Sequence, residues 1–435
     1  MSLYNKSSKY FFEYSLYLFP LFLLIGPLIA EIFLFFFVIN FLYSIIKEKK
    51  IDLLLNKFLI YFFIFYISIL LSTLISHYNF EYSRSGIFYF RLPLFALAIY
   101  MILNSNEFFS KKKVIFFSCF FLIIIFDSLF QYFTGQNLLG YELYKSRISS
   151  FFGGELILGG FLMRVLPIFL VFLIMSNIIK EKSNNFLPSV LVSLICSIIY
   201  LSGERASFFL LLLLFSTIFF TTKFLRKFIL ITMVFFVFIS FVLTKTSISS
   251  QTNPATRMFQ KTFKQFTGQG EEQFEQYKSK IFKKVYLFSH DHHGHYTLSI
   301  KIFKDHPILG VGPKGFRYLC MNRIYILEND DGCSTHPHNT YIHLLTSNGI
   351  IGFSIITFGF FYILKEIFRS RKKLNSERKF DKNLIAENVI ISAVFVNLWP
   401  FIPNGSFFNN WLSMMYFYPI GFYLYFKIKN EKQIS

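Results

Sequence analysis

The sequence has few charged residues for its length. Of its 435 residues, 16% are charged and 54% are hydrophobic, whereas about a quarter of a soluble protein is usually charged. Tryptophan occurs only twice, yet phenylalanine occurs 64 times and tyrosine 26 times. A water-facing surface could not carry so much apolar area, so the composition excludes a soluble multi-domain enzyme. It also excludes a membrane β-barrel, whose strands would alternate polar and apolar residues.

Long apolar runs recur along the whole chain. Because a membrane-spanning helix needs about 20 apolar residues, the apolar fraction could fill about ten to twelve helices. The runs predict twelve spans, at residues 11–29, 31–46, 58–76, 87–103, 114–133, 156–177, 186–201, 206–222, 228–244, 339–364, 384–402 and 408–426. We therefore expect an all-α polytopic membrane protein.

Acidic residues are scarce as well: 24 Asp and Glu stand against 44 Lys and Arg, which gives a net charge of +20. In a membrane protein this excess reports orientation before it suggests a nucleic-acid partner, because basic residues collect in cytoplasmic loops. Alternate connections between the spans hold 25 basic residues, whereas the short loops on the other side hold only Arg84, Lys145, Arg147 and Arg205. We expect both termini in the cytoplasm.

One connection is long and hydrophilic. Residues 245–337 lie on the side opposite the termini and contain most of the remaining charge. An amphipathic pattern over 296–305 predicts a helix, which ends at His306 and Pro307. The expected organisation is nine spans in residues 1–244, a loop domain containing helices in residues 245–337, and three spans with a cytoplasmic tail in residues 338–435.

Cysteine occurs only four times. Cys119 and Cys196 fall within predicted spans, where they are most simply small core residues. Cys320 and Cys333 both fall in the long loop, where an oxidising compartment would allow a disulfide. The alternative is a pair of reduced thiols whose Cα atoms lie too far apart to be bridged.

The densest group of reactive side chains runs from Cys333 to Tyr341, where the long loop meets an apolar run. We expect His338 in the first turn of a helix, whose positive end disfavours imidazolium and leaves a neutral base. At 100° per residue, His338 shares one helix face with Tyr341, Leu345, Gly349 and Gly352. Small residues on that face would let another helix approach closely. The alternative interpretation is a capping turn without chemistry.

Several arginines fall at or near the ends of spans on the side of the long loop. Arg205 and Arg147 lie at span ends, and Arg91 and Arg164 lie slightly inside apolar runs. An ionisable residue at that depth suggests function, and the guanidinium fork suits phosphate. A lipid-linked pyrophosphate is a ligand that several arginines on one side of the membrane would bind. The alternative is a set of structural ion pairs, Arg205 with Glu204 and Arg147 with Glu155.

The segment 290–295 contains four histidines and one aspartate. Imidazoles and carboxylates can bind zinc, but these residues lie too close in sequence for all of them to reach one ion. We expect a polar loop at this position, and no metal or other cofactor.

Several motifs resemble those of the O-antigen ligase and polymerase superfamily of bacterial envelope glycosyltransferases. The clearest is His338 and Asn339, then nine residues, Gly349, two residues and Gly352. Dispersed matches include Ser-Gly-Glu-Arg-Ala-Ser around Arg205, the segment from 305 to 313, and the segment from 405 to 411. The chain departs from the ligases at residues 353 and 354, where Phe-Ser replaces a threonine pair.

The resemblance implies an inverting, metal-independent glycosyltransferase with a fold similar to the C-type membrane glycosyltransferases. The donor would be a glycan on undecaprenyl pyrophosphate, at the periplasmic face of the bacterial inner membrane. His338 corresponds to the family's proposed base and Arg205 to an arginine that holds the donor phosphates. Further candidates for substrate binding are Arg147, Arg257, Arg164, His336, Asn339 and Tyr341.

Three functions remain open from the sequence. The first is an O-antigen ligase, which joins the polysaccharide to lipid A-core. The second is a polymerase of the same superfamily, which adds glycan to glycan. The third is a transporter or flippase for lipid-linked sugars, although a transporter should show two comparable halves, and the loop of residues 245–337 has no counterpart in the first half.

Overall fold

The structure is a computed structural model that describes residues 6–49, 54, 56–75, 85–104, 108–144, 147–181, 185–246, 256–267, 289–322, 324–325 and 332–432. These residues form helices joined by short connections, and none of them forms a strand longer than an isolated bridge. Seven of the described helices are long and apolar enough to span a membrane. The prediction of an all-α polytopic membrane protein is confirmed.

A helix lies at each of the twelve positions where the sequence predicts a span. The helices are α1 (Lys6–Ile25), α2 (Pro27–Glu48), α3 (Lys57–Ile75), α5 (Arg91–Leu103), α6 (Lys111–Thr134), α7 (Leu158–Met175), α8 (Phe186–Leu201), α9 (Arg205–Thr221), α10 (Arg226–Lys245), α14 (Thr340–Ser376), α15 (Lys382–Asn397) and α16 (Asn410–Lys432). The span count of twelve stays a prediction, because five of these helices lie outside the seven that meet the length and hydropathy limits.

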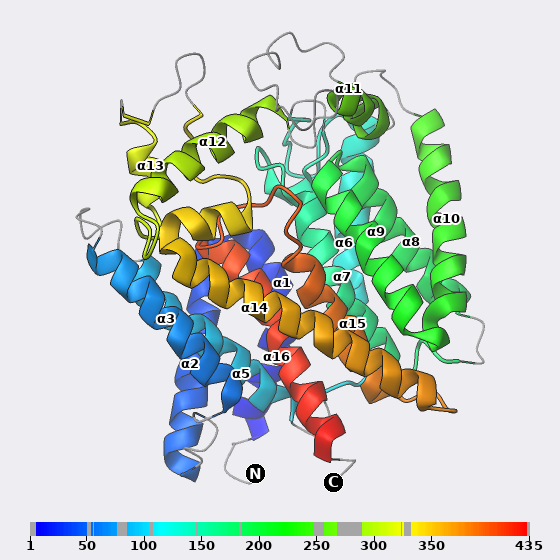
Figure 1. Ribbon diagram of the computed structural model, residues 1–435. Coiled ribbons are helices and arrows are strands. Elements are labelled where there is room, and N and C mark those ends of the chain that lie inside the picture. The colour runs from blue at the N-terminus through cyan, green and yellow to red at the C-terminus, as the bar shows by residue number, and fades with distance from the viewer. Residues whose placement is uncertain are drawn as a thin grey trace.

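The helices form one bundle with the loop helices at one end. In Figure 1, α1 begins and α16 ends at the bottom of the bundle, while α11 (Lys261–Thr267), α12 (His290–Asp305) and α13 (Gly315–Leu319) lie at the top. We call that top the loop end. α7 lies in the centre, with nearly all of its residues buried. α15 is also buried along its length and packs against α7, α14 and α16.

α14 is broken near its start. Gly349 has φ 58° and ψ −161°, which is not helical, so the helix consists of two segments joined at this residue. The prediction that His338 shares one continuous helix face with Gly352 is therefore wrong. Side chains follow a rotation of 100° per residue around the helix axis only within each of the two segments.

The backbone groups freed by this break bond to the segment from Pro307 to Gly312. Val311 N–H donates to the Thr346 carbonyl at 2.9 Å, and Gly312 N–H donates to the Ser347 carbonyl at 2.8 Å. In the other direction, Ile350 N–H donates to the Pro307 carbonyl at 2.8 Å. Irregular backbone is tolerated at membrane depth only where protein or water satisfies its polar groups. The segment thus belongs to the bundle although it is part of the long connection.

Glycines allow the two backbones to meet. A Cβ atom built on Gly349 would overlap the carbonyl of Ile308, and a Cβ atom on Gly310 would lie 2.5 Å from the carbonyl oxygen of Thr346. Gly310 also has a positive φ of 68°. Both glycines are therefore required by the contact itself, in addition to any role at the site.

Gly349→Ala should lower the melting temperature of the purified protein. Its φ and ψ fall in a region open almost only to glycine, where another residue costs on the order of 1–3 kcal/mol, and the new Cβ would meet Ile308. Gly154→Ala is the matched control, because a Cβ there meets nothing within 4 Å. Equal melting temperatures for the two variants in detergent would contradict the described break.

Candidate functional site

His338 lies at the loop end, immediately before α14. Asn339 caps the helix, because its Oδ1 accepts hydrogen bonds from the N–H groups of Tyr341 at 3.0 Å and Ile342 at 3.1 Å. His338 precedes that cap and has a left-handed φ of 57°. The prediction that it lies in the first turn of the helix is therefore wrong by two residues, because helical geometry begins at Thr340.

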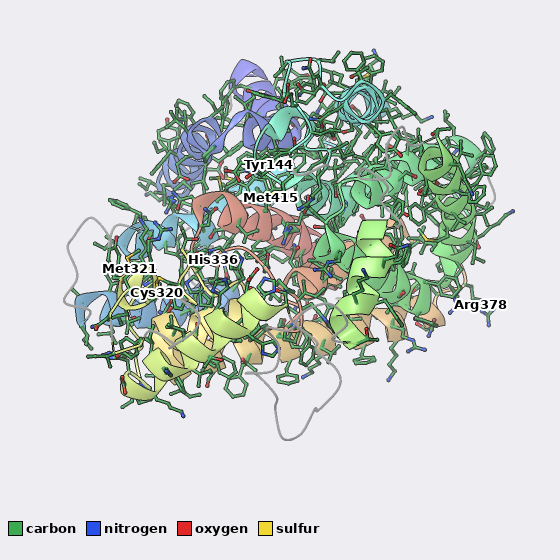
Figure 2. All side chains as sticks on the ribbon, turned by 90° about the horizontal axis from the view of Figure 1, so that it is seen from above. Tyr144, Cys320, Met321, His336, Arg378 and Met415 are labelled. Atoms are coloured by element: carbon green, nitrogen blue, oxygen red, sulfur yellow. A yellow bond between two sulfur atoms is a disulfide. The ribbon has the colours of Figure 1, made fainter. Side chains whose placement is uncertain are left out.

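Four histidines meet around this position. The ring of His338 lies 4.1 Å from the ring of His336, 5.3 Å from that of His295 and 5.6 Å from that of His292, measured between centroids. We call these four residues the histidine cluster. His292 and His295 come from α12, so the predicted polar loop at 290–295 is helical. Viewed from above, His336 lies toward the middle of the molecule, with Cys320 to one side (Figure 2).

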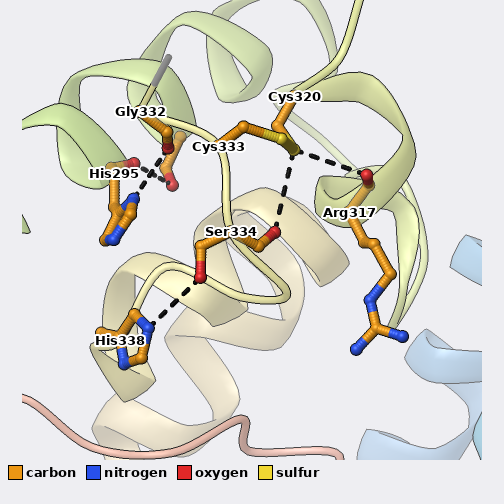
Figure 3. Close-up of a disulfide and its surroundings, with 8 residues drawn as sticks. His295, Arg317, Cys320, Gly332, Cys333, Ser334 and His338 are labelled. Carbon is orange, nitrogen blue, oxygen red and sulfur yellow. Dashed lines mark hydrogen bonds between the residues drawn. A yellow bond between two sulfur atoms is a disulfide. The ribbon is translucent and has the colours of Figure 1, made fainter. Parts of the chain in front are cut away.

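Two rings of the cluster contact the segment that contains Gly332 and Ser334. Nδ1 of His295 lies 2.8 Å from the carbonyl oxygen of Gly332. A carbonyl can only accept, so Nδ1 of His295 carries a hydrogen and donates it to this oxygen. Nε2 of His338 lies 3.3 Å from the hydroxyl of Ser334. Figure 3 shows that both contacts are made to one short segment of the chain, which contains Gly332 and Ser334.

The surroundings of His338, His292 and His336 favour neutral imidazoles. Burial, followed by repulsion from His295, lowers the pKa of His338 to about 4. Burial and the neighbouring rings lower the pKa of His292 to about 4 as well, and they also lower the pKa of His336. The sequence predicted a neutral His338 for a different reason, the positive end of a helix. Desolvation of the charged form is the larger cause here.

A disulfide holds the backbone that carries these contacts. Cys320 and Cys333 are joined, with their Cα atoms 5.0 Å apart. Cys333 stands between Gly332, which bonds to His295, and Ser334, which contacts His338 (Figure 3). The bond therefore ties the residue after α13 to the segment that orients two rings of the cluster.

Arg205 lies beside the histidine cluster. It begins α9 at the loop end, its side chain is exposed, and its Nη1 lies 3.5 Å from the hydroxyl of Thr262 on α11. Its charge is one of the groups that lower the pKa of His292. The structure thus brings together Arg205 and the cluster that contains His338.

Arg147 lies close to the same turn. Its Nε donates to the carbonyl of Ser202 at 2.8 Å, and its Nη2 lies 3.9 Å from a carboxylate oxygen of Glu204. Glu204 accepts further bonds from the N–H groups of Gly159 at 2.7 Å and Gly160 at 2.9 Å. The predicted alternative partner Glu155 is replaced by Glu204, so Arg147 supports the turn that carries Arg205.

Three other candidates have structural contacts. Tyr341 donates its hydroxyl to the carbonyl of Leu398 at 2.8 Å, and Asn339 donates its amide to the carbonyl of Pro400 at 2.8 Å. Arg91, near the start of α5, pairs with Glu31 on α2. The side chain of Arg257 lies outside the described residues. Tyr341 and Asn339 therefore each contact the backbone between α15 and α16, and their part in substrate binding stays a prediction.

Sequence reasoning missed three residues of the site. His292 and His295 are three residues apart on a helix, a spacing that places two rings on one face, and this signal was available. Asn404 follows Pro403 in a loop that no periodicity describes, and its N–H donates to the His338 carbonyl at 2.7 Å. Among the described residues, no group of three His, Cys, Asp or Glu is arranged to hold a metal ion.

Comparison with known families matches part of the chain. Residues 189–357 match the family model described as O-Antigen ligase. The matched range begins within α8, contains α9, α10, the loop helices and His338, and ends within the second segment of α14. The resemblance to the O-antigen ligase superfamily is confirmed by this match. No curated protein matches the chain significantly.

Replacing Cys320 and Cys333 by serine should expose His338. The loss of the bond frees the backbone of Gly332 and Ser334, so diethyl pyrocarbonate, which modifies neutral imidazole, should react with His338 faster. Peptide mass spectrometry measures the rate. Cys119→Ser is the matched control, because Cys119 is a free, exposed cysteine on α6. An unchanged rate in the double variant would show that the disulfide does not hold the cluster.

Proposed function

We propose that this multi-pass membrane protein, whose residues 189–357 match the O-antigen ligase family, is an O-antigen ligase. It transfers a polysaccharide from undecaprenyl pyrophosphate to lipid A-core. The reaction takes place at the periplasmic face of the bacterial inner membrane, with both termini in the cytoplasm. The loop end, which carries α11 to α13, is then the periplasmic end.

The observation that carries this proposal is the position of Arg205 beside the histidine cluster. The transfer needs a neutral base for the acceptor hydroxyl and a positive charge for the leaving pyrophosphate. His338 supplies a half-buried imidazole with a lowered pKa. Arg205 is an exposed guanidinium at the start of α9, close enough to affect His292 of the same cluster.

The proposed reaction inverts the configuration at the donor sugar. His338 takes the proton of the acceptor hydroxyl as the acceptor oxygen bonds to the anomeric carbon of the donor. The bond between that carbon and the pyrophosphate oxygen breaks, and its electron pair leaves with the undecaprenyl pyrophosphate. Arg205 stabilises the charge that develops on the phosphates. Arg147 acts one step away, because it holds the Ser202 and Glu204 backbone turn.

The test of the function is the surface glycan of a deletion strain. For a ligase, full-length polymer should remain on undecaprenyl pyrophosphate, and lipid A-core should carry no attached polysaccharide. Short polymer attached to core would instead indicate the polymerase. This alternative stays open because Phe-Ser at residues 353 and 354 replaces the threonine pair of the ligases. Wild-type protein should restore the glycan and His338→Ala should not. His306→Ala, an exposed histidine of the same loop, is the control that should restore it.

Transfer should keep nearly its full rate as the pH falls from 7 to about 5.5. With a pKa lowered to about 4, the His338 ring stays neutral throughout this range and is lost as a base only near pH 4. A base with the ordinary histidine pKa of about 6.5 would lose about tenfold at pH 5.5. The pH dependence of kcat/KM for purified enzyme distinguishes a base with a pKa of about 4 from one with a pKa of about 6.5. A loss of activity below about pH 6.5 would argue against His338 as the base.

Arg205→Lys should reduce transfer by about a hundredfold, although the charge is kept. A lysine cannot form the two parallel bonds of a guanidinium to phosphate, and losing one such transition-state contact costs about 3 kcal/mol. Arg317→Lys, at an exposed arginine of α13, should have no effect. If Arg205 only neutralised Glu204, Arg205→Lys would be active and Glu204→Gln would rescue Arg205→Gln. Rates of the four variants decide between these roles.

A further inference from the structure

The backbone conformation of His338 needs external support. A left-handed φ of 57° costs a residue with a Cβ roughly 1–2 kcal/mol. Such a residue persists where its surroundings hold it. The support on its carbonyl side is Asn404, whose N–H donates to that carbonyl at 2.7 Å. Asn404 lies in the loop between α15 and α16.

The side chain of Asn404 is itself held at both ends. Its Oδ1 accepts a hydrogen bond from Nη2 of Arg164 at 2.9 Å, and its Nδ2 donates to the hydroxyl of Tyr416 at 2.5 Å. The arginine comes from α7 and the tyrosine from α16. Two buried spans therefore determine where the backbone N–H of Asn404 points.

Arg164 is a charged residue placed deep in the bundle. Only 7% of it is exposed. Its Nη1 donates to the carbonyl of Gly160 at 2.9 Å, and its guanidinium lies 6.0 Å from the ring centre of Tyr416. Among the described residues no carboxylate forms an ion pair with it. A buried, unpaired charge is expensive, so its presence indicates a function that an apolar residue could not perform.

We propose that Arg164 is a positioning residue, which acts on His338 through the side chain of Asn404. This replaces direct binding of the donor, which the sequence suggested for Arg164. The inference rests on the proposed function, since His338 is the base there. Nη1 and Nη2 of Arg164 each donate to a protein oxygen, and together these two bonds fix the guanidinium against Asn404.

The same residue links the two halves of the site. Gly160, whose carbonyl binds Arg164, donates its N–H to Glu204 at 2.9 Å. Glu204 directly precedes Arg205. A single path of contacts thus runs from the turn that carries Arg205, through the start of α7, to Asn404 and the backbone of His338. The path sets the distance between the proposed base and the proposed phosphate-binding arginine.

A double-mutant cycle on Arg164→Gln and Asn404→Ala tests the proposal. Each single variant should lower kcat by about tenfold or more with the donor KM unchanged. The double variant should be no slower than the slower single variant, because both changes break the same path. Arg378→Gln, an exposed arginine at the other end of the molecule, should transfer at the wild-type rate.

A second readout does not depend on transfer. In Arg164→Gln and Asn404→Ala, diethyl pyrocarbonate should modify His338 faster than in wild type, while the rate at exposed His306 stays the same. If wild-type protein transfers no glycan, the proposed function fails, and this measurement still decides the role of Arg164. If Arg164→Gln does not fold, Asn404→Ala alone must show the lowered kcat and the faster modification.

Two results would overturn the proposal. A raised donor KM in Arg164→Gln, with Asn404→Ala fully active, would make Arg164 a direct ligand of the donor. Unchanged modification of His338 in both variants would show that Asn404 does not hold it. Tyr416→Phe separates the two anchors of Asn404, since it removes the tyrosine contact and keeps that of Arg164. It should lower kcat less than Arg164→Gln.

Discussion

The structure depends on one break in a helix. Gly349 interrupts α14, and the backbone groups that lose their helical partners bond to the segment from Pro307 to Gly312. Within a bilayer such groups have no water to bond to, so a broken helix needs a fixed partner. A segment of the long connection is thereby held inside the bundle. α12 precedes this segment and α13 follows it, so both helices are attached to the bundle through it.

The histidine cluster is a direct consequence. α12 ends just before the docked segment, and the first part of α14 ends at the break, so their outer ends must lie side by side. His292 and His295 then face His336 and His338. Pro313, the residue after the segment from Pro307 to Gly312, hydrogen-bonds through its backbone to His343. Because a proline has no N–H, its carbonyl accepts, which agrees with the Phe407 N–H donating to Nδ1 of the same ring.

The surroundings of four arginines depend on the residues that their guanidinium groups contact. Arg91 pairs with Glu31, Arg147 supports the turn at Glu204, Arg164 holds Asn404, and Arg205 remains exposed beside the cluster. All four lie at similar places in the sequence, at or near the end of an apolar run. Their surroundings differ because Arg91, Arg147 and Arg164 are largely enclosed by the groups they contact, whereas the side chain of Arg205 is exposed.

The amino-acid sequence alone was enough to predict the helical class, the positions of the twelve helices, the long connection and the place of His338 where that connection meets an apolar run. These follow from the length of apolar runs and from residues close together in the chain. Only the tertiary structure decided the break in α14, the two histidines from α12, the true cause of the low pKa of His338 and the partners of the arginines. Arg164 and Asn404 are 240 residues apart. No local pattern encodes such a contact, because it exists only once the helices have packed.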